Sequence, residues 1–166
     1  MSYTDYIILT TPSGGECAVV PERIFRMDTT TEQSLNESNL FADRDCTRLT
    51  ILDPETSKRD DVTYIYVRQT PKDIIEANKA KMLPMITLLE IYKGECAIRV
   101  EDICGIVQKP RKHKDGSFER QVTQVRVMGS SALYRSIDYL LVEERPSDII
   151  QKIGNAQSEW YRLNVK

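Results

Sequence analysis

The chain of 166 residues carries the same pattern twice, and this internal repeat constrains its fold more than any other feature. Residues 15–24 (GECAVVPERI) return as residues 94–103 (GECAIRVEDI), with six of ten positions identical. Residues 64–75 (YIYVRQTPKDII) return as residues 139–150 (YLLVEERPSDII). The two pairs are offset by 79 and 75 residues, so they keep both their order and their spacing. We therefore predict a tandem duplication of one small β-rich unit.

Two homologous units are expected from this duplication, over residues 1–83 and 84–166. A unit of about 80 residues buries only about 60 % of the surface that its unfolded chain exposes, and it is marginally stable alone. We therefore expect the two units to pack together as one pseudo-symmetric body. The content of 40 % hydrophobic and 29 % charged residues is that of a globular chain rather than a disordered one.

Alternation of apolar and polar residues predicts five short antiparallel strands in each unit. The expected strands are residues 6–11, 16–20, 25–28, 48–51 and 62–68 in the first unit, and residues 85–92, 95–99, 104–108, 121–127 and 137–143 in the second. One helix is expected after each set of strands. The first begins at Thr70-Pro71 and the second at Pro146, because threonine caps a helix and proline is tolerated in its first turn.

The predicted fold class is α+β, with two tandem repeats. Five short strands in a unit of this size are expected to curl, because sheet twist and exposed edges favour partial closure. Each repeat is therefore expected to form a strongly bent five-stranded antiparallel sheet or a small open barrel, followed by one helix.

The composition predicts a cytoplasmic protein that does not enter a membrane. The first residues, MSYTDY, lack the basic start and the apolar stretch of a secretory signal. No run of about 18 apolar residues is present to span a bilayer. The four cysteines form no CxxC pair, so reduced, small, buried thiols are expected at Cys17, Cys46, Cys96 and Cys104.

No sequence pattern predicts catalysis, and we expect no enzymatic activity, no cofactor and no metal. The phosphate-binding pattern GxxxxGK[ST] does not occur. The single histidine, His113, lies in a hydrophilic stretch, and nothing in the sequence brings a cysteine to it. A zinc site needs several ligands at short spacing, whereas the cysteines are scattered. No catalytic residue is therefore assigned.

The order of the expected elements resembles that of small FlbD-like domains, which are short bacterial and phage proteins. The matching stretches are residues 21–24 with 63–75, and residues 101–103 with 139–150. FlbD-like domains usually occur as a single copy, whereas this chain carries two. The resemblance implies a non-enzymatic accessory or structural module, and it transfers no catalytic residue.

The two units differ most between their third and fourth strands. Residues 28–46 of the first unit carry a net charge of −4, and the acidic partner-loop candidates are Glu32, Glu37, Asp43 and Asp45. Residues 109–120 of the second unit, which include an expected loop at residues 109–118 with a hairpin turn at Asp115-Gly116, carry +3. Their basic candidates are Lys109, Arg111, Lys112, Lys114 and Arg120. The simplest interpretation is that both stretches are solvated loops.

Two functional hypotheses stand beside that interpretation. In the first, the chain is a binding or assembly module whose basic loop meets the acidic loop of the next protomer. Such a heterologous contact builds a homo-oligomeric ring or filament. In the alternative, the basic loop binds the phosphates of nucleic acid or of a small anionic nucleotide ligand, with Phe118 as its one aromatic residue. The net charge of −2 argues against a general polyanion binder but not against a local basic patch.

The closing helix supplies a last pair of candidates. Ile149, Ile153, Ala156 and Trp160 follow helical spacing and predict one apolar stripe. Trp160 and Tyr161 lie beyond the span that the first helix matches. We expect them to cap the core or to cover the other unit. The alternative is a patch that binds a partner, since aromatic residues are good interface anchors.

Overall fold

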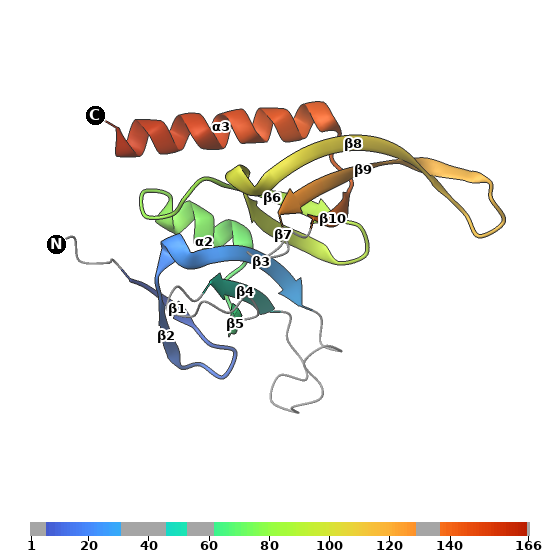
Figure 1. Cartoon of the computed structure of the whole chain (residues 1–166). Coiled ribbons are helices and arrows are strands. Elements are labelled where there is room, and N and C mark those ends of the chain that lie inside the picture. Colours follow the sequence, from blue (N-terminus) through green and yellow to red (C-terminus); the bar gives the residue numbers. More distant parts are fainter. Residues whose placement is uncertain (1–5, 31–45, 53–61, 129–136, 166) are drawn as a thin grey trace.

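The computed structural model describes residues 6–30, 46–52, 62–128 and 137–165, which form antiparallel sheets and two α-helices (Figure 1). The strands are β1 (Ile7–Thr10), β2 (Glu16–Val19), β3 (Ile24–Thr30), β4 (Cys46–Leu52), β5 (Val62–Val67), β6 (Met85–Glu90), β7 (Gly94–Arg99), β8 (Ile103–Lys112), β9 (Phe118–Met128) and β10 (Ile137–Val142). The helices are α2 (Pro71–Asn78), α3 (Pro146–Asn164) and the short 3-10 turns η1 (Pro21–Arg23) and η3 (Val100–Asp102). The prediction of a β-rich chain with two helices is confirmed.

Eight of these strands form one open antiparallel sheet in the order β5-β4-β3-β7-β6-β10-β9-β8. The hairpin of β1 and β2 is a separate two-stranded sheet, in which Ile7 lies opposite Val19. A backbone hydrogen bond of 2.8 Å from Arg68, just after β5, to Thr10 of β1 connects the hairpin to the edge of the larger sheet. The strands of both halves of the chain therefore lie in one body.

A separate five-stranded sheet in each unit, as the sequence predicts, is not what the structure forms. Strand β3 pairs with β7, so that Arg26 lies opposite Ile98 and Met27 lies opposite Ala97. This pairing runs the sheet across the boundary between the two predicted units. The physical reason is that each unit would expose an unpaired edge strand, and joining the two edges satisfies their backbone groups.

The buried apolar side chains form two clusters, and strands β6 and β7 contribute to both. The first cluster lies among β1 to β5 and α2, and it includes Met27 and Ile74. It also takes Met85 and Ala97 from the second half of the chain. The second cluster lies among β6 to β10 and α3, where Ile149 is fully buried. The first core is therefore completed by side chains that follow it in the sequence.

The two helices begin as predicted but differ in length and capping. The side chain of Thr70 accepts a hydrogen bond of 3.1 Å from the amide of Asp73, so α2 has a capped start. Helix α3 begins at Pro146 and has no side-chain cap. Its residues Ile153 and Ala156 pack against the second core, as the apolar stripe predicts. Within the described residues, no helix is long and apolar enough to cross a membrane.

The predicted loop at residues 109–118 is wrong in its extent. Residues 109–112 continue strand β8, with Lys109 opposite Val122 and Arg111 opposite Arg120, and only residues 113–117 form the turn. The resulting long hairpin projects from the body in Figure 1. The side chains of this outer part of β8 are mostly polar and exposed. The sequence there shows no alternation of apolar and polar residues, so it does not predict a strand. The turn at Asp115-Gly116 is confirmed, with Gly116 at a φ of 88°.

Two adjacent leucines of β10 test this division into buried and exposed faces. The side chain of Leu140 is 1 % exposed, whereas that of Leu141 is 40 % exposed. We expect Leu140→Ala to lower the free energy of unfolding by about 2–5 kcal/mol, because it leaves a cavity in the core. Leu141→Ala, the matched control, should cost less than about 1 kcal/mol. Urea unfolding measures both, and equal losses would contradict the assigned register.

Candidate functional site

Strand β8 is one of the two end strands of the eight-stranded sheet, with β5 at the other end, and β9 is its one neighbour among the described strands. Its Val107 side chain is 38 % exposed. Strand β2 likewise has only β1 as a neighbour within the part of the chain that the structure describes. An unpaired edge presents a row of backbone donors and acceptors that another strand is able to bind. Strands β8 and β2 thus each offer such an edge, one in each half of the chain. At the other end of the large sheet, the residue after β5 is linked to β1 by the hydrogen bond from Arg68 to Thr10.

The five predicted basic residues lie together on the hairpin of β8 and β9, but they are not equivalent. The guanidinium of Arg111 lies 3.2 Å from the carboxylate of Glu119. That of Arg120 lies 3.2 Å from the carboxylate of Glu143. The exposed side chains of Lys109, Lys112 and Lys114 form no ion pair with any described residue. Three lysines therefore carry the unneutralised positive charge of the hairpin.

Two aromatic rings flank this charge, and one of them is absent from the sequence prediction. Phe118 is exposed and lies opposite Lys112 in the β8–β9 register. Tyr92, in the turn between β6 and β7, lies under Arg111, whose guanidinium carbon is 4.5 Å from the ring centroid. The sequence predicts Tyr92 as the last residue of a strand. The signal for a turn at this position is the Lys93-Gly94 pair that follows it. Its φ of 64° is unusual for a residue other than glycine.

The four acidic candidates of the first unit, Glu32, Glu37, Asp43 and Asp45, lie outside the described residues. Asp28 at the start of that stretch lies in β3, where its carboxylate is 2.8 Å from the guanidinium of Arg26. Burial lowers the pKa of Arg26, but the carboxylates of Asp28 and Glu90 outweigh it and raise that pKa. This acid–base cluster sits on the β3–β7 pairing, so it stabilises the joint between the halves.

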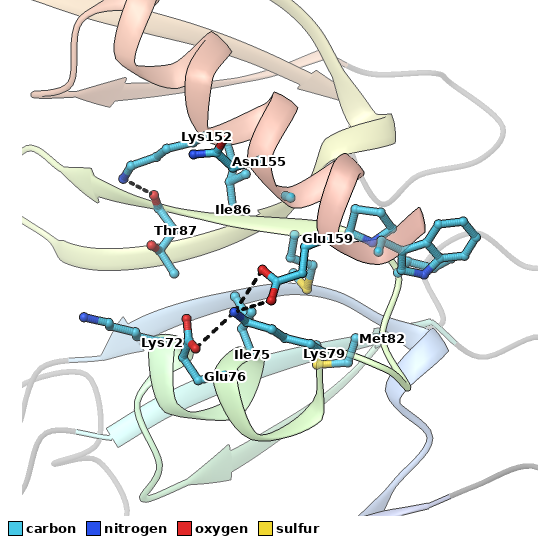
Figure 2. A pocket seen from close by; sticks show the side chains of 15 residues that line it. Lys72, Ile75, Glu76, Lys79, Met82, Ile86, Thr87, Lys152, Asn155 and Glu159 are labelled. Atoms are coloured by element: carbon cyan, nitrogen blue, oxygen red, sulfur yellow. Dashed lines mark hydrogen bonds and ion pairs between the residues drawn. The ribbon is translucent and has the colours of Figure 1, made fainter. Parts of the chain in front are cut away.

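A cavity of about 230 Å³ lies between α2, α3 and the start of β6 (Figure 2). Its apolar wall includes Ile75, Met82 and Trp160. At its rim, the ammonium group of Lys79 lies 3.1 Å from Glu76 and 3.0 Å from Glu159. These hydrogen bonds raise the pKa of Lys79, with Glu159 contributing most.

The charged groups of this cavity serve mainly to join the two helices. Lys79 of the α2 end pairs with Glu159 of α3, and Lys152 donates a hydrogen bond of 2.7 Å to the carbonyl of Thr87. Trp160, a predicted contact residue, lines the cavity. Tyr161, its neighbour, is exposed. The charged side chains around the cavity are therefore engaged in contacts between α2, α3 and β6, and we assign them a structural role.

The cysteines differ from one another in their environment. All four lie in the described residues, and none forms a disulfide. Cys46 and Cys96 are buried and Cys17 is half-buried, but Cys104 is exposed, so the prediction of a buried thiol is wrong there. Cys104 lies at the irregularity of β8 between Ile103 and Gly105, on a strand whose one neighbour among the described strands is β9. Burial, with Glu90 nearby, raises the pKa of Cys96 to about 12.

A metal centre or a histidine nucleophile pair finds no support in the geometry. Across residues 6–30, 46–52, 62–128 and 137–165, no group of three or more His, Cys, Asp or Glu side chains could hold a metal ion. The ring of His113 is exposed at the hairpin turn, where its Nδ1 lies 4.0 Å from Glu119.

Comparison with known proteins finds no family model, curated protein or solved structure that matches this chain. The resemblance to FlbD-like domains therefore stays a prediction. Function has to be argued from the edges, charges and burial of this molecule.

The thiols provide a test of these environments. In the folded protein, we expect Ellman's reagent to modify Cys104 rapidly, because its side chain is exposed. Cys96 should react only after unfolding, since burial and a pKa of about 12 keep it a protonated thiol. Cys104→Ser is the control and should remove the rapid phase. A rapid phase that persists in this variant would contradict the assignment.

Proposed function

We propose that the chain is a non-catalytic assembly module, built by tandem duplication, that associates with further copies of itself. The order of pairings supports the duplication. In residues 7–78 a hairpin (β1–β2) is followed by a three-stranded meander (β3–β4–β5) and α2. In residues 85–164 a hairpin (β6–β7) is followed by a meander (β8–β9–β10) and α3. The proposed units are residues 1–83 and 84–166, related by pseudo-symmetry.

Matched hydrogen bonds add support at the level of single atoms. The hydroxyl of Thr47 donates to the carbonyl of Gln69 over 2.6 Å. At the corresponding positions, the hydroxyl of Thr123 donates to the carbonyl of Glu144 over 2.5 Å. The bond from Arg68 to Thr10 has its counterpart in a bond of 3.1 Å from the amide of Glu143 to the carbonyl of Leu89. Equivalent hydrogen bonds at equivalent positions are expected if the two units arose by duplication.

The observation that carries the assembly proposal is the contrast between corresponding strands β3 and β8. Strand β3 is paired on both sides, by β4 and β7, and its Ile24 and Met27 are 1 % and 0 % exposed. Among the strands that the structure describes, β8 is paired on one side, by β9, and the corresponding Ile103 and Ile106 are only partly buried. One copy of the unit thus has its edge covered, while the other copy leaves the same edge open. A further protein strand would complete it.

The charge of the hairpin makes this association sensitive to salt. Lysines on an edge strand oppose nonspecific pairing with other strands, because a buried lysine charge is costly. They favour a partner that carries acidic side chains. The acidic stretch at residues 28–46 is the proposed electrostatic partner of the lysines. The proposed location of the assembly is the cytoplasm. The contact is heterologous, because the two edges differ, so it leads to a ring or a filament.

The proposal predicts that the mass in solution rises with protein concentration. Sedimentation velocity at low salt should show species heavier than the single chain of 19.1 kDa. In about 1 M sodium chloride, where the screening length is about 3 Å, association should weaken several-fold but persist, since backbone pairing and apolar contact do not depend on charge. A single-chain mass at every concentration and salt would remove the proposal.

Nucleic-acid binding is the second candidate, favoured by the combination of charge and rings on the hairpin. Lys109, Lys112 and Lys114 are exposed beside the exposed rings of Phe118 and Tyr92. Proteins that bind single strands combine phosphate contacts with rings on which bases stack. Arg111 and Arg120 are less available, because carboxylates of the same chain already hold them. A small anionic ligand would use the same lysines.

This second candidate predicts a defined mutational response. Changing Lys109, Lys112 and Lys114 together to Glu should weaken binding of a fluorescent single-stranded oligonucleotide at least about tenfold at low salt, by removing phosphate contacts. Lys81→Glu, at an exposed position outside the hairpin, is the control. Fluorescence anisotropy measures the change. No binding by the unmodified protein at low salt would dismiss this candidate and leave the assembly proposal standing.

A further inference from the structure

We infer that β8 of one copy pairs with β2 of the next copy, in the register that joins β3 to β7 inside the chain. The inference rests on the proposed self-association and names the surfaces that form it. Strand β8 corresponds to β3, and β2 corresponds to β7, through the offset of 79 residues that relates the two repeats. The chain would thus repeat between molecules a contact that it already makes within one molecule.

The internal contact is well defined. Met27 lies opposite Ala97, which is 0 % exposed, and Asp28 lies opposite Cys96. The hydroxyl of Thr29 donates a hydrogen bond of 2.7 Å to the carbonyl of Glu95. These contacts fix one antiparallel register between two strands of different repeats. Any copy of the contact should keep the same register, because a slip by one residue would turn the apolar side chains to the other face.

Transfer of this register to a second molecule brings together residues that lie uncovered in the single chain. Ile106 would lie opposite Ala18, and Val107 opposite Cys17. Ala18 is exposed and Cys17 is half-buried, whereas their counterparts Ala97 and Cys96 are buried in the internal contact. The segment of β8 that would pair, residues 103–108, contains no charged side chain. The lysines begin only beyond it.

The second core would also be completed in the same way as the first. The first core takes in Met85 and Ala97 from the following repeat. The corresponding residues for the second core are Tyr6 and Ala18 of another copy. Tyr6 is 58 % exposed in the single chain, so its ring is available for such a contact. Pairing would place its ring against the partly buried Ile103 and Ile106.

The start of α3 offers a matching polar contact. In the chain, a side-chain oxygen of Glu95 accepts a hydrogen bond of 3.0 Å from the amide of Lys72 in the first turn of α2. The corresponding pair between molecules is Glu16 and the amide of Ser147 in the first turn of α3. Glu16 is exposed, and α3 has no side-chain cap of its own. A carboxylate there would stabilise the positive end of the helix.

Two substitutions, one on each edge, test the inference in the full-length protein. Ala18→Asp alters only an exposed side chain of the single chain, but it would place a carboxylate in the apolar contact. Ile106→Lys would place a charge in the same contact from β8, at a residue that is partly buried against the second core in the single chain. We expect each change to raise the dissociation constant of self-association at least about 100-fold, because an unpaired charge would be buried. Matched controls at exposed positions are Ser158→Asp and Leu141→Lys, which should leave association unchanged.

A mixing experiment identifies the pairing as head to tail. Each variant keeps one intact edge, so an equimolar mixture of the Ala18→Asp and Ile106→Lys proteins should regain association by joining the intact β8 of the first to the intact β2 of the second. Sedimentation velocity measures this, and thermal melting checks that both variants fold. Oligomers that survive Ala18→Asp would overturn the β8–β2 contact while leaving self-association intact. A single-chain mass for the unmodified protein would instead overturn the proposed function itself.

A crosslink tests the register independently of any loss of folding. With Cys104→Ser removing the exposed thiol, Val107→Cys should lie opposite Cys17 of the next copy, at the spacing of a cross-strand pair that a disulfide can bridge. Oxidation with copper phenanthroline should then give a ladder of linked chains on a non-reducing gel. The ladder should vanish when Cys17→Ser is added. A ladder that persists without Cys17 would reject this register.

Discussion

The pairing of β3 with β7 is the contact on which the rest of the molecule depends. It is the ladder through which the eight-stranded sheet passes from the first half of the chain to the second. Around it, the first core receives Ala97 and Met85, and the ion pairs of Arg26 connect β3 to the second half. A small β-rich unit buries too little apolar surface to be secure alone. Each half of this chain therefore relies on an edge that its neighbour supplies.

The sequence predicted the composition of the fold better than its connections. Local signals located the helix starts at Thr70 and Pro146 and the turn at Asp115-Gly116, because capping and turn chemistry involve neighbouring residues. The pairing across the two halves joins residues about 70 positions apart, such as Met27 and Ala97, and no local pattern encodes it. The β-propensity of a strand also does not determine which other strand it will pair with.

The candidate site was predictable in its charge but not in its surroundings. The basic residues of the hairpin were visible as a cluster, yet their neutralisation by Glu119 and Glu143 required the register of β8 and β9 and of β9 and β10. The ring of Tyr92 comes to Arg111 from another turn, through the sheet order. Cys104 likewise lies on the end strand β8, and the position of a strand at the end of a sheet is a property of the whole sheet.

The continuity of the backbone between α2 and β6 has a kinetic and thermodynamic consequence. Residues 79–84 tether the second half of the chain to the first, so strands β3 and β7 meet at an effective concentration of order millimolar, whatever the protein concentration. The internal joint is thus permanent. The same joint between separate molecules would have no tether, and its occupancy would follow the amount of protein present. The same strand pairing would then be a fixed part of the fold within one chain and a concentration-dependent contact between chains.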